Sequence, residues 1–376
     1  MNIALQKTFE LLLIILLGIL LQKKVPKKES LGGLKTIILS IALPATIFLA
    51  LLKIKLDESL LVLPLMALCF NFLMFFAVRY LLDFSIPIHD ENKKRTLNML
   101  LPSLAPGLSC FPFIIAYLGD DFLALAALAD VGNKIFGLII LYMLAMYWYR
   151  KRAEKSNASN KSKLKSLLLS LLNEPINMVI IIALLMLAFG FNITSFPEFL
   201  QNTIGRLSVI MVPLVLLFIG MAVRIKFSDF RYIFQMLTWR AGITFCISAV
   251  FIFLLPELST GMMLLLIVFP QSSCSFWPFA HMSAVKGLED KDGQDKPTFD
   301  LDFAVSILAC SLPFSTLLII SVFYFGDYVA NPMALIILGI AMILFSLIPK
   351  GIKAVKKKTK KPEWKNGIIK ELELDE

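Results

Sequence analysis

Long apolar runs, separated by short charged or Pro/Gly-containing segments, make up most of the 376-residue chain. A helix that crosses a bilayer needs about 20 predominantly apolar residues, because the hydrocarbon core is about 30 Å thick. Runs of this kind predict eleven spanning helices, five of them before the polar stretch 150–165. The predicted helices cover residues 4–22, 31–52, 59–81, 97–117, 122–148, 174–192, 203–223, 236–255, 259–284, 302–325 and 332–348.

Composition agrees with this pattern and excludes a soluble enzyme. Hydrophobic residues make up 58% of the chain and charged residues 17%, with a mean hydropathy of +0.80, whereas soluble domains are about half apolar and a quarter charged. The net charge of +10 would suggest nucleic acid in a soluble protein, but here Lys and Arg gather between apolar runs. We therefore expect no nucleic-acid partner. The five cysteines lie inside apolar runs without metal-ligand spacing and are interpreted as packing residues, so no metal site is expected.

The basic connections predict how the chain is oriented. Alternate connections carry the Lys and Arg clusters at 23–28, 93–95, 150–165 and 224–231 and the tail from 350 onward. Cytoplasmic loops carry such an excess, so we expect an integral protein of the plasma or cytoplasmic membrane with its N-terminus outside and its C-terminus in the cytoplasm. The first apolar run is followed by Gln22 and two lysines, which favours a membrane helix over a cleaved signal peptide. The basic tail is a candidate for contact with anionic lipid, and a stop-transfer anchor is the alternative.

Matching prolines indicate an internal repeat. Pro44 and Pro213 lie 169 positions apart, and Pro112 and Pro278 lie 166 positions apart. Because each half holds an odd number of spans, consecutive copies enter the membrane in opposite senses. The prediction is an all-α polytopic membrane protein of two inverted five-helix repeats plus an extra C-terminal helix. Its expected divisions are repeat one at 1–149, a basic cytoplasmic linker at 150–166, repeat two at 167–326, the additional helix at 327–349 and the tail at 350–376.

Proline and glycine predict that helices four and nine are broken near the middle of the membrane. Each interior proline removes a backbone hydrogen bond at a cost of about 3 kcal/mol. Freed backbone groups are tolerated at that depth where they are buried in protein or line a wet cavity, and the N-termini of half-helices suit an anion. We therefore expect the substrate site where the two breaks cross. The candidate substrate-binding residues are Pro106, Gly107, Ser109, Gln271, Ser272 and Ser273.

Charged and polar residues inside predicted spans are candidates for ion coupling. Asp130 and Lys134 share one face of helix five, with Asn133 beside them, and His281 lies in helix nine. An isolated charge at the bilayer centre costs roughly 2.5 to 3.5 kcal/mol, so both charges should face the protein interior. A permanent structural pair is the alternative for Asp130 and Lys134, and a packing role is the alternative for His281. No transport role is expected for Arg240, which lies near the end of a predicted helix.

Several segments resemble one family of permeases. They are LKTIILSIALPATIFLALL around Pro44, LGDDFLALAALADVGN ending at Asn133, the Asn173-Glu174-Pro175 opening of helix six, and PLVLLFIG from Pro213 to Gly220. Over residues 8–325 the chain resembles the auxin efflux carrier family, which includes plant auxin carriers and bacterial malonate or malate carriers. The resemblance implies two inverted five-helix repeats, broken helices four and nine at the substrate site, and a possible homodimer. Lys134 and the eleventh helix lie outside the usual pattern of the family.

The function expected from these features is secondary transport of a small organic carboxylate anion by alternating access at the crossing. No GxxxxGK[ST] loop is present, so the driving force should be a gradient or the membrane potential, without a cofactor. Coupling to protons or sodium and simple uniport both stay open. The alternative is a membrane sensor that binds the anion and signals through the cytoplasmic tail. An intramembrane enzyme would need paired catalytic Asp residues or a HExxH site, and since neither pattern occurs we expect no catalytic residues.

Overall fold

The computed structural model describes residues 3–24, 28–53, 62–88, 90–152, 175–222, 230–255, 257–292 and 297–359, and all regular elements in these ranges are helices. Six helices of the described residues are long and apolar enough to cross a membrane. Shorter apolar helices at Phe9–Leu21, Met178–Ala188 and Pro332–Ile348, with the two broken helices below, complete the eleven predicted spans. The prediction of an all-helical membrane fold is confirmed. The predicted linker falls mostly on residues 153–174, which lie outside the described residues. In the predicted tail, 350–376, no side chain is described.

The first spans show how a proline is accommodated within a helix. The first span is α1 (Ile3–Leu21), and the second consists of α2 (Lys28–Ile37), the π-helical η1 (Ile38–Ala42) and α3 (Leu43–Leu51). Pro44 is the second residue of α3, and the N–H of Leu43 donates to the carbonyl of Ile38 in a wider turn. Such a π-turn adjusts the hydrogen bonding ahead of a residue that has no N–H.

The matching proline of the second half also follows an interruption. The seventh span is divided into α12 (Glu198–Val209) and α13 (Met211–Ala222), so that Ile210 separates the two segments just before Pro213. The other unbroken spans and connecting turns are α4 (Val62–Ser85), α8 (Asp120–Ile135) with η3 (Phe136–Ile140) and α9 (Leu141–Arg152), α11 (Pro175–Ala188), η4 (Ile193–Ser195), α14 (Phe230–Leu254), α17 (Leu301–Phe325), η5 (Gly326–Tyr328) and α18 (Pro332–Thr359).

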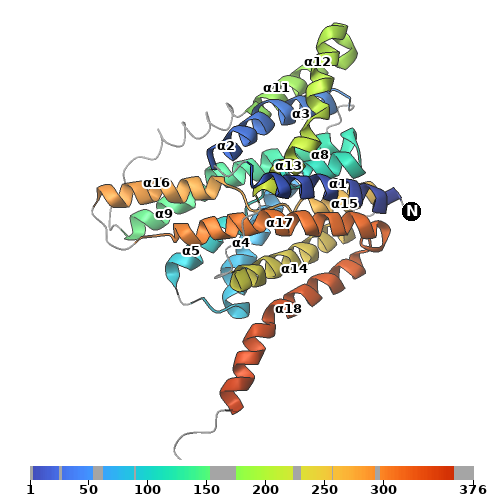
Figure 1. Ribbon diagram of the computed structural model, residues 1–376. Coiled ribbons are helices and arrows are strands. Elements are labelled where there is room, and N and C mark those ends of the chain that lie inside the picture. The colour runs from blue at the N-terminus through green and yellow to red at the C-terminus, as the bar shows by residue number, and fades with distance from the viewer. Residues whose placement is uncertain are drawn as a thin grey trace, which may run out of the picture.

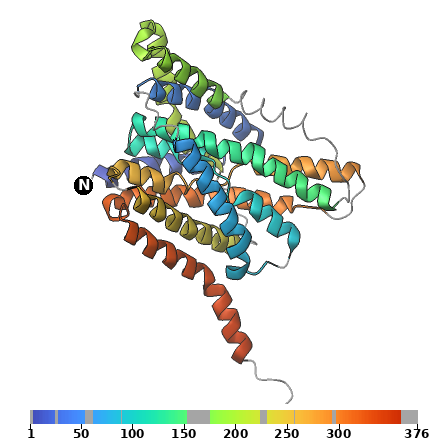
Figure 2. The same ribbon diagram turned by 180° about the vertical axis from the view of Figure 1, so that it is seen from behind.

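Helices four and nine are broken, as predicted. The fourth span comprises α5 (Glu91–Leu100), α6 (Pro106–Ser109) and α7 (Phe111–Tyr117), and the ninth comprises α15 (Thr260–Val268) and α16 (Trp277–Lys291). Figures 1 and 2 show that α9 and α16 end, and α5 begins, on the same side of the bundle. We call this side the basic end, because it carries Arg79, Lys94, Arg95, Lys151 and Arg152 near the ends of α4, α5 and α9.

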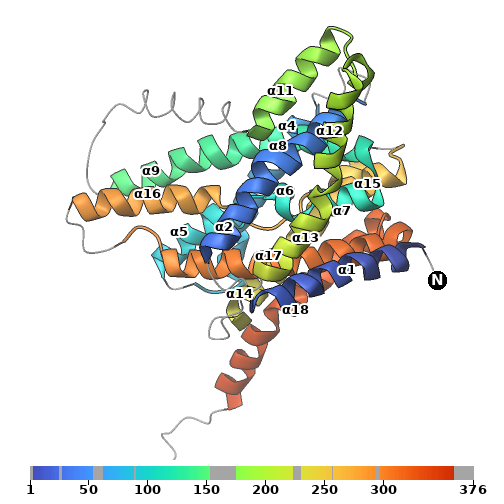
Figure 3. The same ribbon diagram turned by 45° about the horizontal axis from the view of Figure 1, so that its top comes forward.

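Paired glycines bring two pairs of helices into close contact. A Cβ atom added at Gly18 of α1 would lie 2.4 Å from the carbonyl oxygen of Leu217 in α13, and Gly220 faces α1 in the same way. A Cβ atom at Gly242 of α14 would lie 2.7 Å from the carbonyl oxygen of Gly339 in α18. Small residues allow such backbone contacts between membrane helices. Accordingly, α1 lies beside α13 (Figure 3), and α18 lies along α14 before its last turns leave the bundle (Figure 1).

Candidate functional site

The two breaks touch each other through hydrogen bonds. The backbone N–H of Ala105 donates to the carbonyl of Ser273 at 2.8 Å, and the N–H of Ser273 donates to Ser109 Oγ at 2.9 Å. The N–H of Ser275 donates to Ser103 Oγ at 3.0 Å. Each unwound segment therefore supplies hydrogen-bond partners for backbone groups of the other segment that are no longer paired within a helix. This mutual pairing satisfies the polar groups of unwound segments within a membrane protein.

The side chain of Arg240 contacts backbone carbonyl groups of both broken helices. Its Nε donates to the carbonyl of Leu101 at 2.8 Å, and its Nη2 donates to the carbonyl of Ser272 at 2.9 Å and contacts that of Ser103 at 3.5 Å. Only 2% of the residue is exposed. The carbonyls lie just beyond the C-terminal ends of α5 and α15, where helices carry partial negative charge. A guanidinium at this place compensates both ends at once.

The expectation that Arg240 lies near a helix end is wrong. The apolar run suggested a helix start near residue 236, but α14 begins at Phe230 and places Arg240 well inside the helix. Residues 230–235 (FRYIFQ), which precede the predicted start, also belong to the helix. The side chain of Arg240 does not extend to the membrane–water interface; its guanidinium group instead donates to backbone carbonyls.

A cavity of about 320 Å³ lies beside the crossing. Its walls come from α2 and η1, from both breaks and from the end of α8 and start of η3. It is lined by Lys35, Leu39, Leu104, Ala105, Pro106, Gly107, Leu108, Asp130, Asn133, Lys134, Gly137, Ser275, Phe276 and Trp277. The volume is near the lower end of the roughly 300–1,000 Å³ typical of ligand pockets, which suits a small molecule.

The lining of this cavity carries one net positive charge. Lys134 Nζ lies 3.5 Å from Asp130 Oδ2, and both residues are buried. Lys35 adds a second cation, whose Nζ lies 4.8 Å from the ring centroid of Phe276. The N-terminus of the 15-residue helix α16 also faces the cavity, through Phe276 and Trp277, and adds the partial positive charge of a helix start. The arrangement favours an anion.

Two asparagines tie this charged wall to the break in helix four. Asn133 Nδ2 donates to Asp130 Oδ1 at 2.8 Å and to the carbonyl of Leu104 at 3.0 Å. Asn71 of α4 donates from Nδ2 to Asn133 Oδ1 at 2.9 Å and to the carbonyl of Pro102 at 3.2 Å. The carboxylate is therefore oriented by the same network that holds the unwound backbone. Asn71 was not identified from the sequence, although an amide in an otherwise apolar run was a usable signal.

The candidate residues divide between the cavity and the crossing behind it. Pro106, Gly107, Asp130, Asn133 and Lys134 line the cavity. The other candidates on the two breaks are buried within the crossing and do not line the cavity: Ser109, Gln271, Ser272 and Ser273.

His281 lies behind the cavity wall. Its Nε2 is 3.0 Å from the carbonyl oxygen of Gly137, and its ring packs edge-on against Tyr142. The residue is not among those that line the cavity. These contacts join α16 to η3 and α9, which agrees with a packing role for the imidazole.

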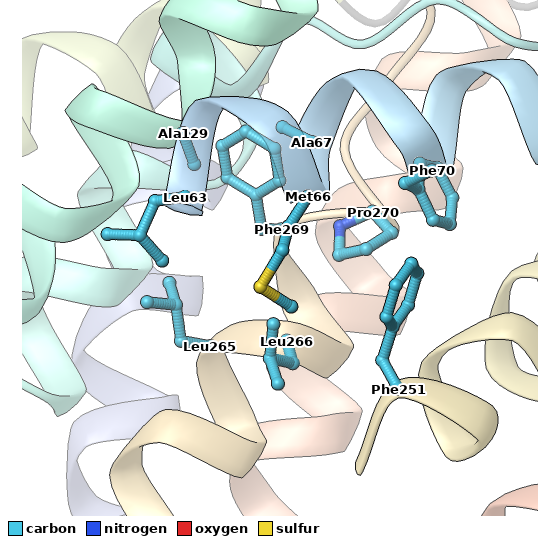
Figure 4. A pocket seen from close by; sticks show the side chains of 10 residues that line it. All are labelled: Leu63, Met66, Ala67, Phe70, Ala129, Phe251, Leu265, Leu266, Phe269 and Pro270. Carbon is cyan, nitrogen blue, oxygen red and sulfur yellow. The ribbon is translucent and has the colours of Figure 1, made fainter. Parts of the chain in front are cut away.

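A second, apolar pocket lies between α4, α8, α14 and α15. In Figure 4, Leu63 and Met66 of α4 line this pocket from one side and Leu265 of α15 lines it from the opposite side. Its volume is about 40 Å³, and no charged side chain lines it. A small apolar cavity of this kind does not replace the hydration of an anion. The charged cavity beside the crossing is therefore the candidate site.

Comparison with known proteins agrees with the membrane architecture. The chain is 25% identical over 206 residues to an uncharacterized transporter of Methanocaldococcus jannaschii. The match covers 54% of this chain and 63% of the relative. The chain is a transporter-like integral membrane protein. No known protein-family profile matches it.

Proposed function

We propose that the protein is a secondary carrier that moves a small organic anion, a carboxylate, by alternating access at the crossing of the two broken helices. The observation that carries this proposal is the cavity beside the crossing, with Lys35, Lys134 and the N-terminus of α16 in its wall. Resemblance of the chain to the auxin efflux carrier family supports the same kind of substrate. By the positive-inside rule, the basic end faces the cytoplasm.

The net charge of the residues that line the cavity determines which anions can bind without leaving an excess charge. Lys35 and Lys134 carry two positive charges and Asp130 one negative charge. A monocarboxylate therefore leaves the loaded site neutral. A dicarboxylate leaves one excess negative charge, which a proton on Asp130 would remove. Coupling to protons is accordingly proposed for dianions, with Asp130 as the acceptor and Lys134 as its neighbour at 3.5 Å.

The membrane potential supplies a driving force for export without coupling. At 100 mV, inside negative, moving one charge across the membrane is worth about 2.3 kcal/mol. This favours expelling a monoanion by about 40-fold. Uptake of a dianion would oppose about twice that energy and would need coupled protons, sodium or counter-exchange.

Flux in proteoliposomes tests the proposal. Purified protein is challenged with malonate, malate, succinate and indole-acetate, while pH and sodium gradients are varied separately and radiolabel uptake and charge movement are recorded. Saturable net flux of at least one anion is expected. Saturable binding without flux would contradict a carrier and favour the sensor.

Lys134→Met is the informative variant, and Lys286→Met is its matched control. Lys134 pairs with Asp130 four residues before it, and Lys286 pairs with Asp290 four residues after it, at 2.7 Å on an exposed part of α16. Both variants therefore break an i,i+4 ion pair on a helix. We expect loss of flux in Lys134→Met only. Wild-type flux in that variant would remove Lys134 from the site.

A further inference from the structure

A third cavity, of about 360 Å³, lies at the basic end between α4, α5 and α9. It shares no lining residue with the cavity at the crossing. Its charged lining residues are Arg79, Asp83, Glu91, Lys94, Arg95 and Lys151. The transport proposal uses none of them.

Positive charge is in excess around this cavity. Lys94 Nζ lies 2.8 Å from Asp83 Oδ2 and 3.3 Å from Glu91 Oε1, so both carboxylates of the lining form ion pairs with the same lysine. Within the described ranges, the other three cations of the lining form no ion pair with a carboxylate: Arg79, Arg95 and Lys151.

Charges of both signs surround Arg95: the guanidinium groups of Arg152 and Arg79, and the carboxylates of Glu91 and Glu289. Glu91 already pairs with Lys94 at 3.3 Å. Like charges held this close repel one another, and an anion in the cavity would relieve that repulsion.

Asn98 points to a second feature of the ligand. The residue lines the cavity and is 7% exposed, and its Nδ2 donates to the carbonyl of Lys94 at 2.9 Å. Its Oδ1 is buried and has no hydrogen-bond partner. A buried carbonyl oxygen of this kind needs a donor. An acceptor-only anion cannot supply one, whereas a hydroxyl group can.

We propose that this cavity binds a phosphate ester that carries a free hydroxyl group. The chemistry is that of the phosphoglycerol headgroup of an anionic lipid and of soluble glycerol phosphate. Arg79 and Arg95 offer guanidinium forks that match phosphate oxygens, and Lys151 adds a point charge. The hydroxyl donates to Asn98 Oδ1. Basic cavities between membrane helices at this level are suited to lipid headgroups.

Binding here would act on the transport machinery through α5. This helix carries Arg95 and Asn98 and ends at Leu100, directly before the break that meets Arg240. A ligand that draws α4, α5 and α9 together therefore stabilises the segment that leads into the crossing.

Thermal unfolding of the purified, delipidated full chain tests the site. The probes are mixed micelles with phosphatidylglycerol, phosphatidylmethanol or phosphatidylcholine and, separately, glycerol phosphate and inorganic phosphate in solution. We expect phosphatidylglycerol or glycerol phosphate to raise the unfolding temperature in a saturable way, and which of them does so identifies the source. Stabilisation by neither probe beyond phosphatidylcholine and inorganic phosphate would overturn the proposal. Phosphatidylmethanol has the same charge but no hydroxyl, so equal stabilisation by it would overturn the role of Asn98.

Charge-removing variants separate the cavity from the surface around it. Arg79 and Lys151 are exposed, so Arg79→Met and Lys151→Met are expected to fold. Each should weaken the apparent affinity about tenfold, the size of a lost charge-assisted hydrogen bond. Lys286→Met removes an exposed cation of α16 outside the cavity and should leave the affinity unchanged. An equal response of all three variants would show a diffuse surface effect and contradict a defined site.

Discussion

Replacing Arg240 by Met is expected to loosen the crossing and to stop transport. The side chain makes two hydrogen bonds of 2.8 and 2.9 Å, to the carbonyls of Leu101 and Ser272, one on each break. Methionine fills much of the volume but leaves both carbonyls buried without a donor, at about 1–3 kcal/mol each. Removing the guanidinium also removes the cost of burying its charge, which offsets part of the loss. We expect a net destabilisation of about 2–3 kcal/mol.

The free energy of unfolding in mixed detergent micelles measures this effect, with flux in proteoliposomes as the second readout. Arg240→Lys should give an intermediate loss, because one ammonium group cannot span both breaks as the planar fork does. Arg206→Met is the control, since Arg206 is an exposed residue of α12. If Arg240→Met stayed within about 1 kcal/mol of wild type and kept its flux, the guanidinium would not hold the crossing.

Two glycine substitutions test the close helix contacts. Gly132→Ala would place a Cβ atom 1.9 Å from the carbonyl oxygen of Pro64, so α4 and α8 must separate; we expect a loss of about 1–3 kcal/mol together with reduced flux, because the asparagine network bridges these helices. Gly339→Ala would place a Cβ atom 2.6 Å from Cys246 Sγ in α14, and we expect a similar loss of stability with unchanged flux per folded molecule, since α18 lines no part of the cavity.

Gly287→Ala is the control for both substitutions. Gly287 also lies in a helix, but a Cβ atom there meets no atom within 4 Å. Since alanine is the better helix former, this variant should be as stable as wild type or up to about 1 kcal/mol more stable. A loss of stability as large as in the other two variants would mean that glycine is needed for a reason other than close packing.

Local chemistry made the breaks predictable from the sequence. Pro102, Pro106 and Gly107 remove hydrogen bonds or helix preference within a short segment, and the gap between α5 and α6 lies there. The second break follows the same logic, since α15 ends before Pro270 and α16 begins with Pro278 as its second residue. These effects act within one or two turns of a helix.

Pairing between distant segments was not predictable in this way. Hydropathy identified Lys35 only as a residue within an apolar span, yet it lines the same cavity as Lys134. Arg240 was placed at a helix end, because hydropathy marks the apolar part of a helix and not where its hydrogen bonds begin. What decides its role is the contact with Leu101, 139 positions away in the chain. One sequence carries no direct information on such contacts.

The segment after helix α15 shows a finer limit. The sequence predicts Gln271, Ser272 and Ser273 as substrate-binding residues, because they are polar and lie in the segment that matches the first break. In the structure they are buried against the crossing, while Ser275 faces the cavity. In an unwound segment no fixed period relates sequence position to direction, so polarity alone cannot tell which residue meets the substrate.

The charge balance of the cavity leads to a prediction about Asp130. In Asp130→Asn the wall, which holds Lys35 and Lys134, would carry two net positive charges instead of one, while the amide oxygen at 130 can still accept from Asn133. One unit charge at about 6 Å, with an effective dielectric constant of about 20, is worth about 3 kcal/mol. The preference for a dianion over a monoanion should therefore rise by about 10- to 100-fold.

Malonate and propionate, which both contain three carbons, make a suitable pair for competition binding at pH 7.5. Asp120→Asn is the control, because Asp120 pairs with Lys53 outside the cavity. If the malonate preference of Asp130→Asn did not exceed that of Asp120→Asn, the anion would not bind beside Asp130, and the charge argument for this cavity would fail.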